Sequence, residues 1–100
     1  MIALKTPLFK PGRVVATPDA LEGLVQADQS IWMFLARHLA GDWGVVDAGD
    51  KESNDQALKD GSRLLSAYVL TTGQQIWIIS EAEDDNGNRA VTTALTPNEY

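Results

Sequence analysis

The chain has 100 residues, 44% hydrophobic and 22% charged, a composition typical of one globular domain and not of a disordered segment. It contains no cysteine, which excludes disulfide bonds, thiolate metal sites and a cysteine nucleophile. No apolar run approaches the roughly 20 residues that a membrane span needs, and the first ten residues lack the apolar core of a signal peptide. We therefore expect a cytoplasmic protein with a single domain over residues 1–100 and no membrane partner.

Fourteen acidic and eight basic side chains give a net charge of −6, and the negative charge is unevenly distributed. Residues 1–40 sum to +1, residues 41–60 to −4 and residues 61–100 to −3. No cluster of Lys and Arg is present to neutralise phosphates, so nucleic acid is not an expected partner. An acid-rich surface serves either solubility or the binding of a protein partner, and both interpretations stay open.

An extended N-terminal arm is expected over residues 1–12, because its prolines and glycine disfavour regular structure. Residues 13–16, with two adjacent valines, predict a short strand. A helix follows over residues 18–27, since Thr17 is a good N-cap and Pro18 suits the first helical position.

The second helix has the clearest pattern in the chain. Its core-facing stripe has the spacing of one helix face and consists of Ile31, Phe34, Leu35, His38 and Leu39. Either Asp28 or Ser30 can cap its start, and Gly41 can end it. The next segment, residues 42–47, mixes turn residues with large apolar ones and predicts an ordered loop.

A third, mostly exposed helix is expected over residues 50–60, with Gly61 at its end. Its start stays open, because Asp50 is a good cap and Ser53 with Gln56 has the spacing of a capping box.

Three strands are expected over residues 63–70, 74–80 and 89–95. A turn of two threonines and a glycine joins the first two, and an acidic loop over residues 81–88 leads to the third. These strands predict an antiparallel meander, with residues 13–16 added at an edge. The predicted fold class is α+β, with two to three N-terminal helices packed on a C-terminal sheet of three to four antiparallel strands.

Both faces of this sheet are apolar at the centre. Ile76 and Ile78 face one way, whereas Trp77 and Ile79 face the other. The second helix covers one face, and the other needs cover from the N-terminal arm, the loop around Trp43 or a second subunit. A homodimer is therefore one expectation.

His38 is the only histidine, which makes it the first candidate for acid–base chemistry. The alternative interpretation is a structural histidine that hydrogen-bonds within the core. In the catalytic interpretation, Ser66 can be drawn as the nucleophile and His38 as its base. The groups available on the sheet to complete a catalytic set are Arg63, Tyr68 and Thr92. A helix with His on a sheet with Arg and hydroxyls resembles, in layout, the metal-independent ribonucleases of the barnase, colicin and RelE type.

A second candidate is a binding surface for a protein partner, built from Trp43 and the nearby acids Asp42, Asp47 and Asp50. The alternative is that the tryptophans belong to the core or to a dimer interface. The acidic loop over residues 81–88 lacks the ligand order of an EF-hand, and no nucleotide-binding fingerprint is present, so neither a metal nor a cofactor is expected.

Residues 34–44, FLARHLAGDWG, resemble a signature of a small protein family carried on plasmids, phages and integrative elements. Further similarity lies at Asn54, Ala57-Leu58, Gly61, residues 63–68, residues 76–79 and residues 97–100. The resemblance covers residues 12–100 and departs from the family at the longer acidic loop over residues 81–88. It implies a bacterial mobile-element origin. A type I restriction label, which some members carry, is not supported here, since no methyltransferase, helicase or nuclease motif is present.

Two hypotheses follow. In the first, the protein is a non-enzymatic, protein-binding accessory or anti-defence factor that contacts a host protein through its acidic surface, where carboxylates take the place of phosphates. In the second, it is a small ribonuclease in which His38 and Arg63 carry the catalysis.

Overall fold

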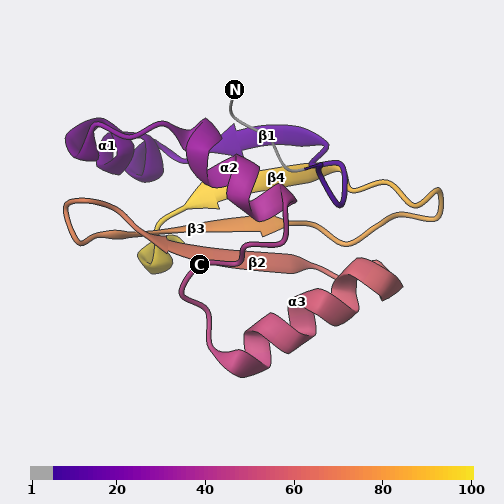
Figure 1. Ribbon diagram of the computed structural model, residues 1–100. Coiled ribbons are helices and arrows are strands. Elements are labelled where there is room, and N and C mark those ends of the chain that lie inside the picture. Colours follow the sequence, from indigo (N-terminus) through magenta and orange to yellow (C-terminus); the bar gives the residue numbers. More distant parts are fainter. Residues whose placement is uncertain (1–5) are drawn as a thin grey trace.

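Residues 6–100, which the computed structural model describes, form one four-stranded sheet and three α-helices (Figure 1). The element order is β1 (Arg13–Ala16), α1 (Pro18–Ala27), α2 (Ile31–Leu39), α3 (Ala48–Asp60), β2 (Leu64–Val69), β3 (Gln75–Ser80), β4 (Val91–Leu95) and a 3₁₀ turn, η1 (Pro97–Glu99). The predicted α+β class is confirmed. No helix in this part of the chain has the length and apolarity to span a membrane, and the first five residues of the expected arm lie outside it.

The sheet is mixed and not wholly antiparallel, which corrects the prediction. Its strand order is β1-β4-β3-β2. The three C-terminal strands form the expected antiparallel meander, and β1 joins at the expected edge, but it runs parallel to β4. Three helices separate β1 from the meander, so no hairpin determines its direction.

Side-chain caps mark where the helices begin. The Thr17 hydroxyl caps α1, as predicted, and the Ser30 hydroxyl caps α2, so Asp28 is not the cap of that helix. The α3 helix begins two residues before Asp50, because the Asp47 carboxylate accepts the backbone N–H of Asp50. The predicted start of this helix was therefore too late.

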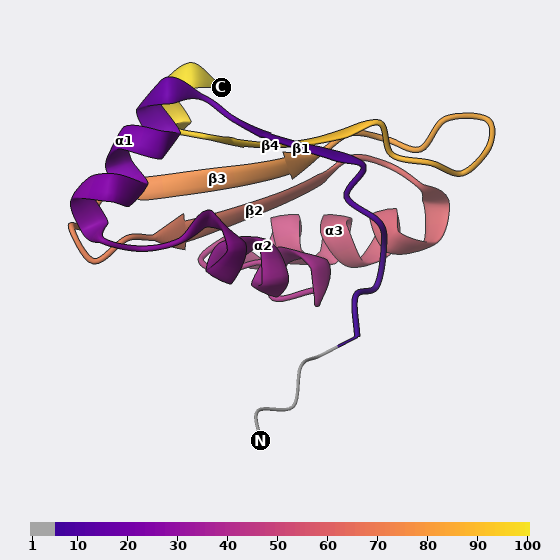
Figure 2. The ribbon, with the colours of Figure 1, turned by 90° about the horizontal axis from the view of Figure 1, so that it is seen from above.

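The helices cover one face of the sheet, and the chain's C-terminal end lies against the other (Figure 2). On the helix side, Ile76 and Ile78 pack with Phe34 of α2 in the main core. On the opposite side, the ring centroids of Trp77 and Tyr100 lie 5.3 Å apart. Within residues 6–100, the C-terminal turn contacts Trp77 on this face, whereas Phe9 of the arm and Trp43 pack beside His38 on the helix side, which is a further correction.

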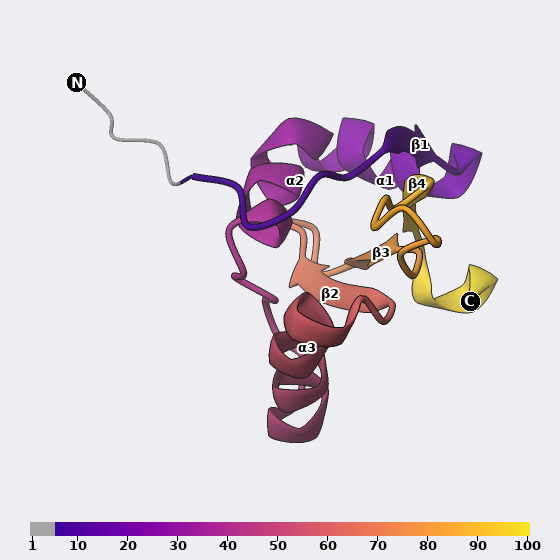
Figure 3. The ribbon, with the colours of Figure 1, turned by 90° about the vertical axis from the view of Figure 1, so that its right-hand side faces the viewer.

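The outer edge of β2 is closed by the chain itself. The Asn54 side chain of α3, the helix below β2 in Figure 3, donates to the Leu65 carbonyl at 2.7 Å and accepts the Leu65 N–H at 3.0 Å. Residues 43–45 bond both backbone groups of Ala67. Gly44 has a φ of +76°, and a Cβ there would lie 1.9 Å from the Ala67 carbonyl oxygen, so only glycine fits this approach.

Candidate functional site

His38 is fully buried between α2 and the sheet, inside a chain of hydrogen bonds. Its Nδ1 lies 2.5 Å from Ser66 Oγ, and its Nε2 lies 2.9 Å from Ser80 Oγ. Ser80 Oγ lies 2.6 Å from Thr92 Oγ1, which in turn donates to the Pro11 carbonyl oxygen at 2.7 Å. The chain of contacts therefore links α2, three strands and the N-terminal arm.

The carbonyl at one end determines the direction of every proton in this chain. A carbonyl only accepts, so the Thr92 hydroxyl gives its proton to Pro11 and must accept from Ser80. Ser80 has then used its proton and accepts from Nε2–H of His38. We infer the neutral Nε2–H tautomer, with Nδ1 accepting from Ser66.

The environment of His38 keeps the imidazole neutral. Burial, followed by the positive charge of Arg89, lowers the pKa of His38 from 6.5 to about 3. The rings of Phe9 and Trp43 meet the imidazole edge-on, with centroids 5.3 and 5.7 Å away. A neutral ring with both nitrogens bonded and no exposed surface cannot exchange a proton with an external substrate.

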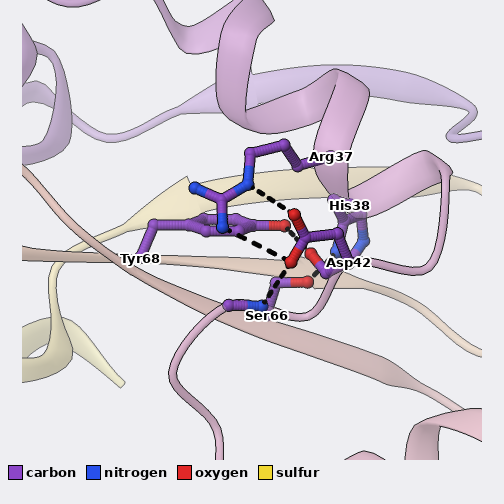
Figure 4. A network of polar contacts seen from close by, with 6 residues as sticks. Arg37, His38, Asp42, Ser66 and Tyr68 are labelled. Atoms are coloured by element: carbon purple, nitrogen blue, oxygen red, sulfur yellow. Dashed lines mark hydrogen bonds and ion pairs between the residues drawn. The ribbon is translucent and has the colours of Figure 1, made fainter.

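Tyr68 belongs to a neighbouring cluster at the end of α2 (Figure 4). Its hydroxyl donates to the Asp42 backbone carbonyl at 2.7 Å, and burial raises its pKa to about 12. The Arg37 guanidinium lies 4.6 Å above the Tyr68 ring and bonds both carboxylate oxygens of Asp42, with Nε 2.7 Å from Oδ2. Asp42 also accepts the Gly44 N–H at 3.2 Å. These contacts hold the loop that closes β2.

Arg63 lies apart from the histidine. Its Nη2 lies 2.6 Å from the Tyr100 hydroxyl, and its guanidinium is 5.6 Å from the centre of that ring. Tyr100 contacts Trp77 on the sheet face that the helices leave open. The structure thus brings His38 and Thr92 together through Ser80, but it places Arg63 on the other side of the sheet.

Trp43 is buried, at 3% exposure, and is not available to a partner. Its indole N–H donates to Asp55 of α3 at 3.1 Å, and the ring packs with Ala57 and Leu64. The exposed tryptophan is Trp32, at 64%.

Asp47 and Asp50 lie at the exposed start of α3, and further exposed carboxylates follow along this helix. We define the acidic surface as the exposed acids of this helix, its cap and the loop after β3. Its members are Asp47, Asp50, Glu52, Asp55, Asp60, Glu81, Glu83, Asp84 and Asp85.

The two parts of the acidic surface are continuous. Gly61, which ends α3, accepts the Glu83 N–H at 2.8 Å, so the base of the loop lies against the end of the helix. The 13 residues of α3 extend the surface by about 20 Å. Residues 47–60 hold five acids and two bases, residues 81–89 hold four acids and one base, and the rest of the chain holds five of each. The whole net charge of −6 therefore belongs to these two segments.

Arg89 supports the acidic surface from beneath, a role that the sequence did not reveal. Its side chain is buried, at 5% exposure, and donates to the carbonyl oxygens of Ser62, Glu81 and Ala57 at 2.6, 2.9 and 3.3 Å. These bonds tie the end of α3 to the base of the loop. The sequence around Arg89, which follows an Asn-Gly turn, does not indicate that its side chain is buried, because the carbonyl oxygens that it bonds include those of distant segments.

Within residues 6–100, no group of three or more His, Asp or Glu side chains is arranged to hold a metal ion. Comparison with protein-family models, curated proteins and solved structures finds no match for this chain. The site is therefore interpreted from its own residues and geometry.

Proposed function

We propose that this is a non-enzymatic, cytoplasmic accessory protein that binds a basic protein partner through its acidic surface. The observation that carries the proposal is the placement of the entire net charge on α3 and the adjoining loop, with the rest of the chain neutral. The resemblance of residues 34–44 to a mobile-element family supports a role in which the partner is a host protein, such as a factor of a defence system.

The chemistry of the acidic surface favours a partner that normally holds nucleic acid. Exposed carboxylates are spread along about 20 Å of α3, so the helix carries an excess of negative charge over its length, as a phosphate backbone does. The nine acids outnumber the two lysines of α3, one of which pairs with Asp55 at 3.5 Å, and a basic cleft relieves the repulsion of the remaining excess when it binds them. Two of these carboxylates have further reason to stay ionised: the hydrogen bond from Trp43 lowers the pKa of Asp55, and the hydrogen bond from Ser62 lowers the pKa of Asp60.

Apart from its charge, the α3 helix contributes little to the core. Its buried residues are Asn54 and Ala57, and most of its other side chains face solvent. A helix with so small an apolar face is held by its neighbours and displays charge. No observation favours the ribonuclease hypothesis, since His38 is sealed and neutral and Arg63 lies on the opposite side of the sheet.

The test is affinity capture from a nuclease-treated bacterial lysate with two matched double variants. Glu52→Lys/Asp85→Lys changes the acidic surface, and Asp19→Lys/Glu22→Lys changes exposed acids of α1, so both variants have a net charge of −2. We expect the wild type and the α1 variant to retain the same basic proteins, with binding competed by DNA. The acidic-surface variant should lose them. Equal capture by both variants would overturn the proposal.

A further inference from the structure

The two edges of the sheet differ in whether other parts of the chain hydrogen-bond to them. The β2 edge is closed by Asn54 and by residues 43–45, as described above. The β1 edge has no such cover from residues 6–100, and it forms the upper border of the sheet in Figure 1. An unpaired strand edge is a template for pairing with another strand.

The outward-facing backbone groups of β1 can be identified. The N–H groups of Arg13 and Thr17 point inward, to the Ala90 and Ala94 carbonyls, at 3.1 and 3.0 Å. Since strand N–H groups alternate in direction, both backbone groups of Val14 and Ala16 point away from the sheet. No group within residues 6–100 pairs with them. The strand is short and begins with the charged Arg13, but the outward-facing Val14 and Ala16 are apolar, and the strand contains no proline or bulge to protect its edge.

We propose that the β1 edge pairs with the β1 edge of a second copy of this chain, antiparallel and about a two-fold axis, to form a continuous eight-stranded sheet. Antiparallel pairing of identical strands is self-complementary, as a two-fold interface requires. Val14 then exchanges two hydrogen bonds with Ala16 of the second copy, and Ala16 does the same with Val14, giving four bonds in total.

The ends of the strand restrict the register. Gly12, with a φ of +67°, stands outside the strand, and Pro18 has no N–H to donate. The register that uses both outward-facing residues places Val15 opposite Val15 of the second copy, as a non-hydrogen-bonded pair. Arg13 then faces Thr17, so the two arginines do not oppose each other.

The charge distribution favours a second copy on this edge. The α3 part of the acidic surface lies beyond β2, at the far side of the sheet from β1 (Figure 3), whereas the loop part joins β3 to β4. Pairing through β1 keeps the two α3 helices apart and leaves their carboxylates accessible, whereas pairing through β2 would bring these like charges together.

The absence of cysteine makes a direct test simple. A non-hydrogen-bonded pair has Cα atoms about 4.5 Å apart, within the range of a disulfide. Val15→Cys should therefore cross-link to its own copy quickly under mild oxidation. Arg13→Cys serves as the matched control, because in this register the two residues 13 lie about 13 Å apart along the strands. Equal cross-linking rates for the two variants would overturn the register.

Sedimentation of the cysteine-free chain tests the pairing itself. Val14→Pro removes an outward N–H and keeps the inward bonds of β1, so the dimer should dissociate about ten-fold or more readily. Val14→Ala keeps the N–H and should dimerise like the wild type. Circular dichroism checks that both variants fold. A wild type that stays monomeric at millimolar concentration, or a dimer that Val14→Pro leaves intact, would contradict the proposal, and capture of an extended peptide by the monomer would point to a different occupant of this edge.

Discussion

His38 serves packing, although a lone histidine beside serine is the kind of pair that catalysis uses. Both of its ring nitrogens are committed to serine hydroxyls, and the chain of bonds ends at a carbonyl of the arm. The sequence placed His38 on the core side of α2, which the structure bears out. It offered Ser66 only as a nucleophile that His38 could serve as base, without fixing their geometry, and in the structure the two side chains share a buried hydrogen bond. Its complete burial depended on Phe9 and Trp43, whose positions no local pattern indicates.

The buried histidine makes stability depend on pH. The unfolded chain binds a proton at His38 near pH 6.5, whereas the folded chain does so only near pH 3. The free energy of unfolding should therefore fall as pH drops from 6.5, by about 1.4 kcal/mol for each pH unit. Urea unfolding between pH 7.5 and 4.5 measures this slope, and His38→Gln should lack it. Identical slopes for the two proteins would contradict a neutral, buried His38.

Thr92 carries the end of the hydrogen-bond chain, and its removal should be costly. Thr92→Val leaves the Pro11 carbonyl and the Ser80 hydroxyl without this partner in the core, which costs about 1–3 kcal/mol of stability. Thr93→Val, on the opposite face of the same strand, should change stability by less than about 0.5 kcal/mol. Thermal unfolding of the two variants separates the cases. Equal melting temperatures would show that the chain of bonds adds no stability.

At the scale of elements, local signals predicted the helices and the meander well. Caps and stops such as Thr17 and Gly61 act within a few residues, so their effects are visible in the sequence. The direction of β1 was not visible in the sequence, because its parallel pairing with β4 joins segments about 80 residues apart. Asn54 was only partly predictable from the sequence. Its spacing to Ala57 marks one helix face, but nothing local reveals that its amide hydrogen-bonds the edge of β2.

Asn54 should prove the main attachment between α3 and β2. Asn54→Ala leaves the N–H and C=O of Leu65 without this partner, and we expect a loss of about 2 kcal/mol or more. The Leu65 amide should also exchange hydrogen faster. Ser53→Ala, an exposed neighbour on the same helix, is the control and should leave both measurements unchanged. Protection of the Leu65 amide that survives Asn54→Ala would refute this role.

For the whole molecule, the separation of charge is the feature with the clearest functional meaning. A body with no net charge carries the exposed carboxylates of α3 and of the loop after β3. The sequence indicated an acidic region from residue 42 onward, but Asp42 pairs with Arg37 and Trp43 is buried, so the surface begins at Asp47. The spatial union of α3 with the later loop through Gly61 and Arg89 required the tertiary structure.

This arrangement predicts that the purified protein does not cleave RNA. His38, Tyr68 and Thr92 are buried, and Arg63 bonds Tyr100 instead of lying beside them. The wild type and His38→Ala should therefore be equally inactive over pH 5–8. The assay compares fluorogenic RNA turnover by the two proteins. Turnover by the wild type that disappears in His38→Ala would restore the ribonuclease hypothesis.

The most direct measurement of the central claim is the affinity of the captured partner, once purified, for the two charge-matched variants. Calorimetry at low and physiological salt should show weak binding by Glu52→Lys/Asp85→Lys and near wild-type binding by Asp19→Lys/Glu22→Lys. The wild-type affinity should also fall as salt rises. Equal affinities for the two variants, or binding that salt does not weaken, would contradict the acidic surface as the functional site.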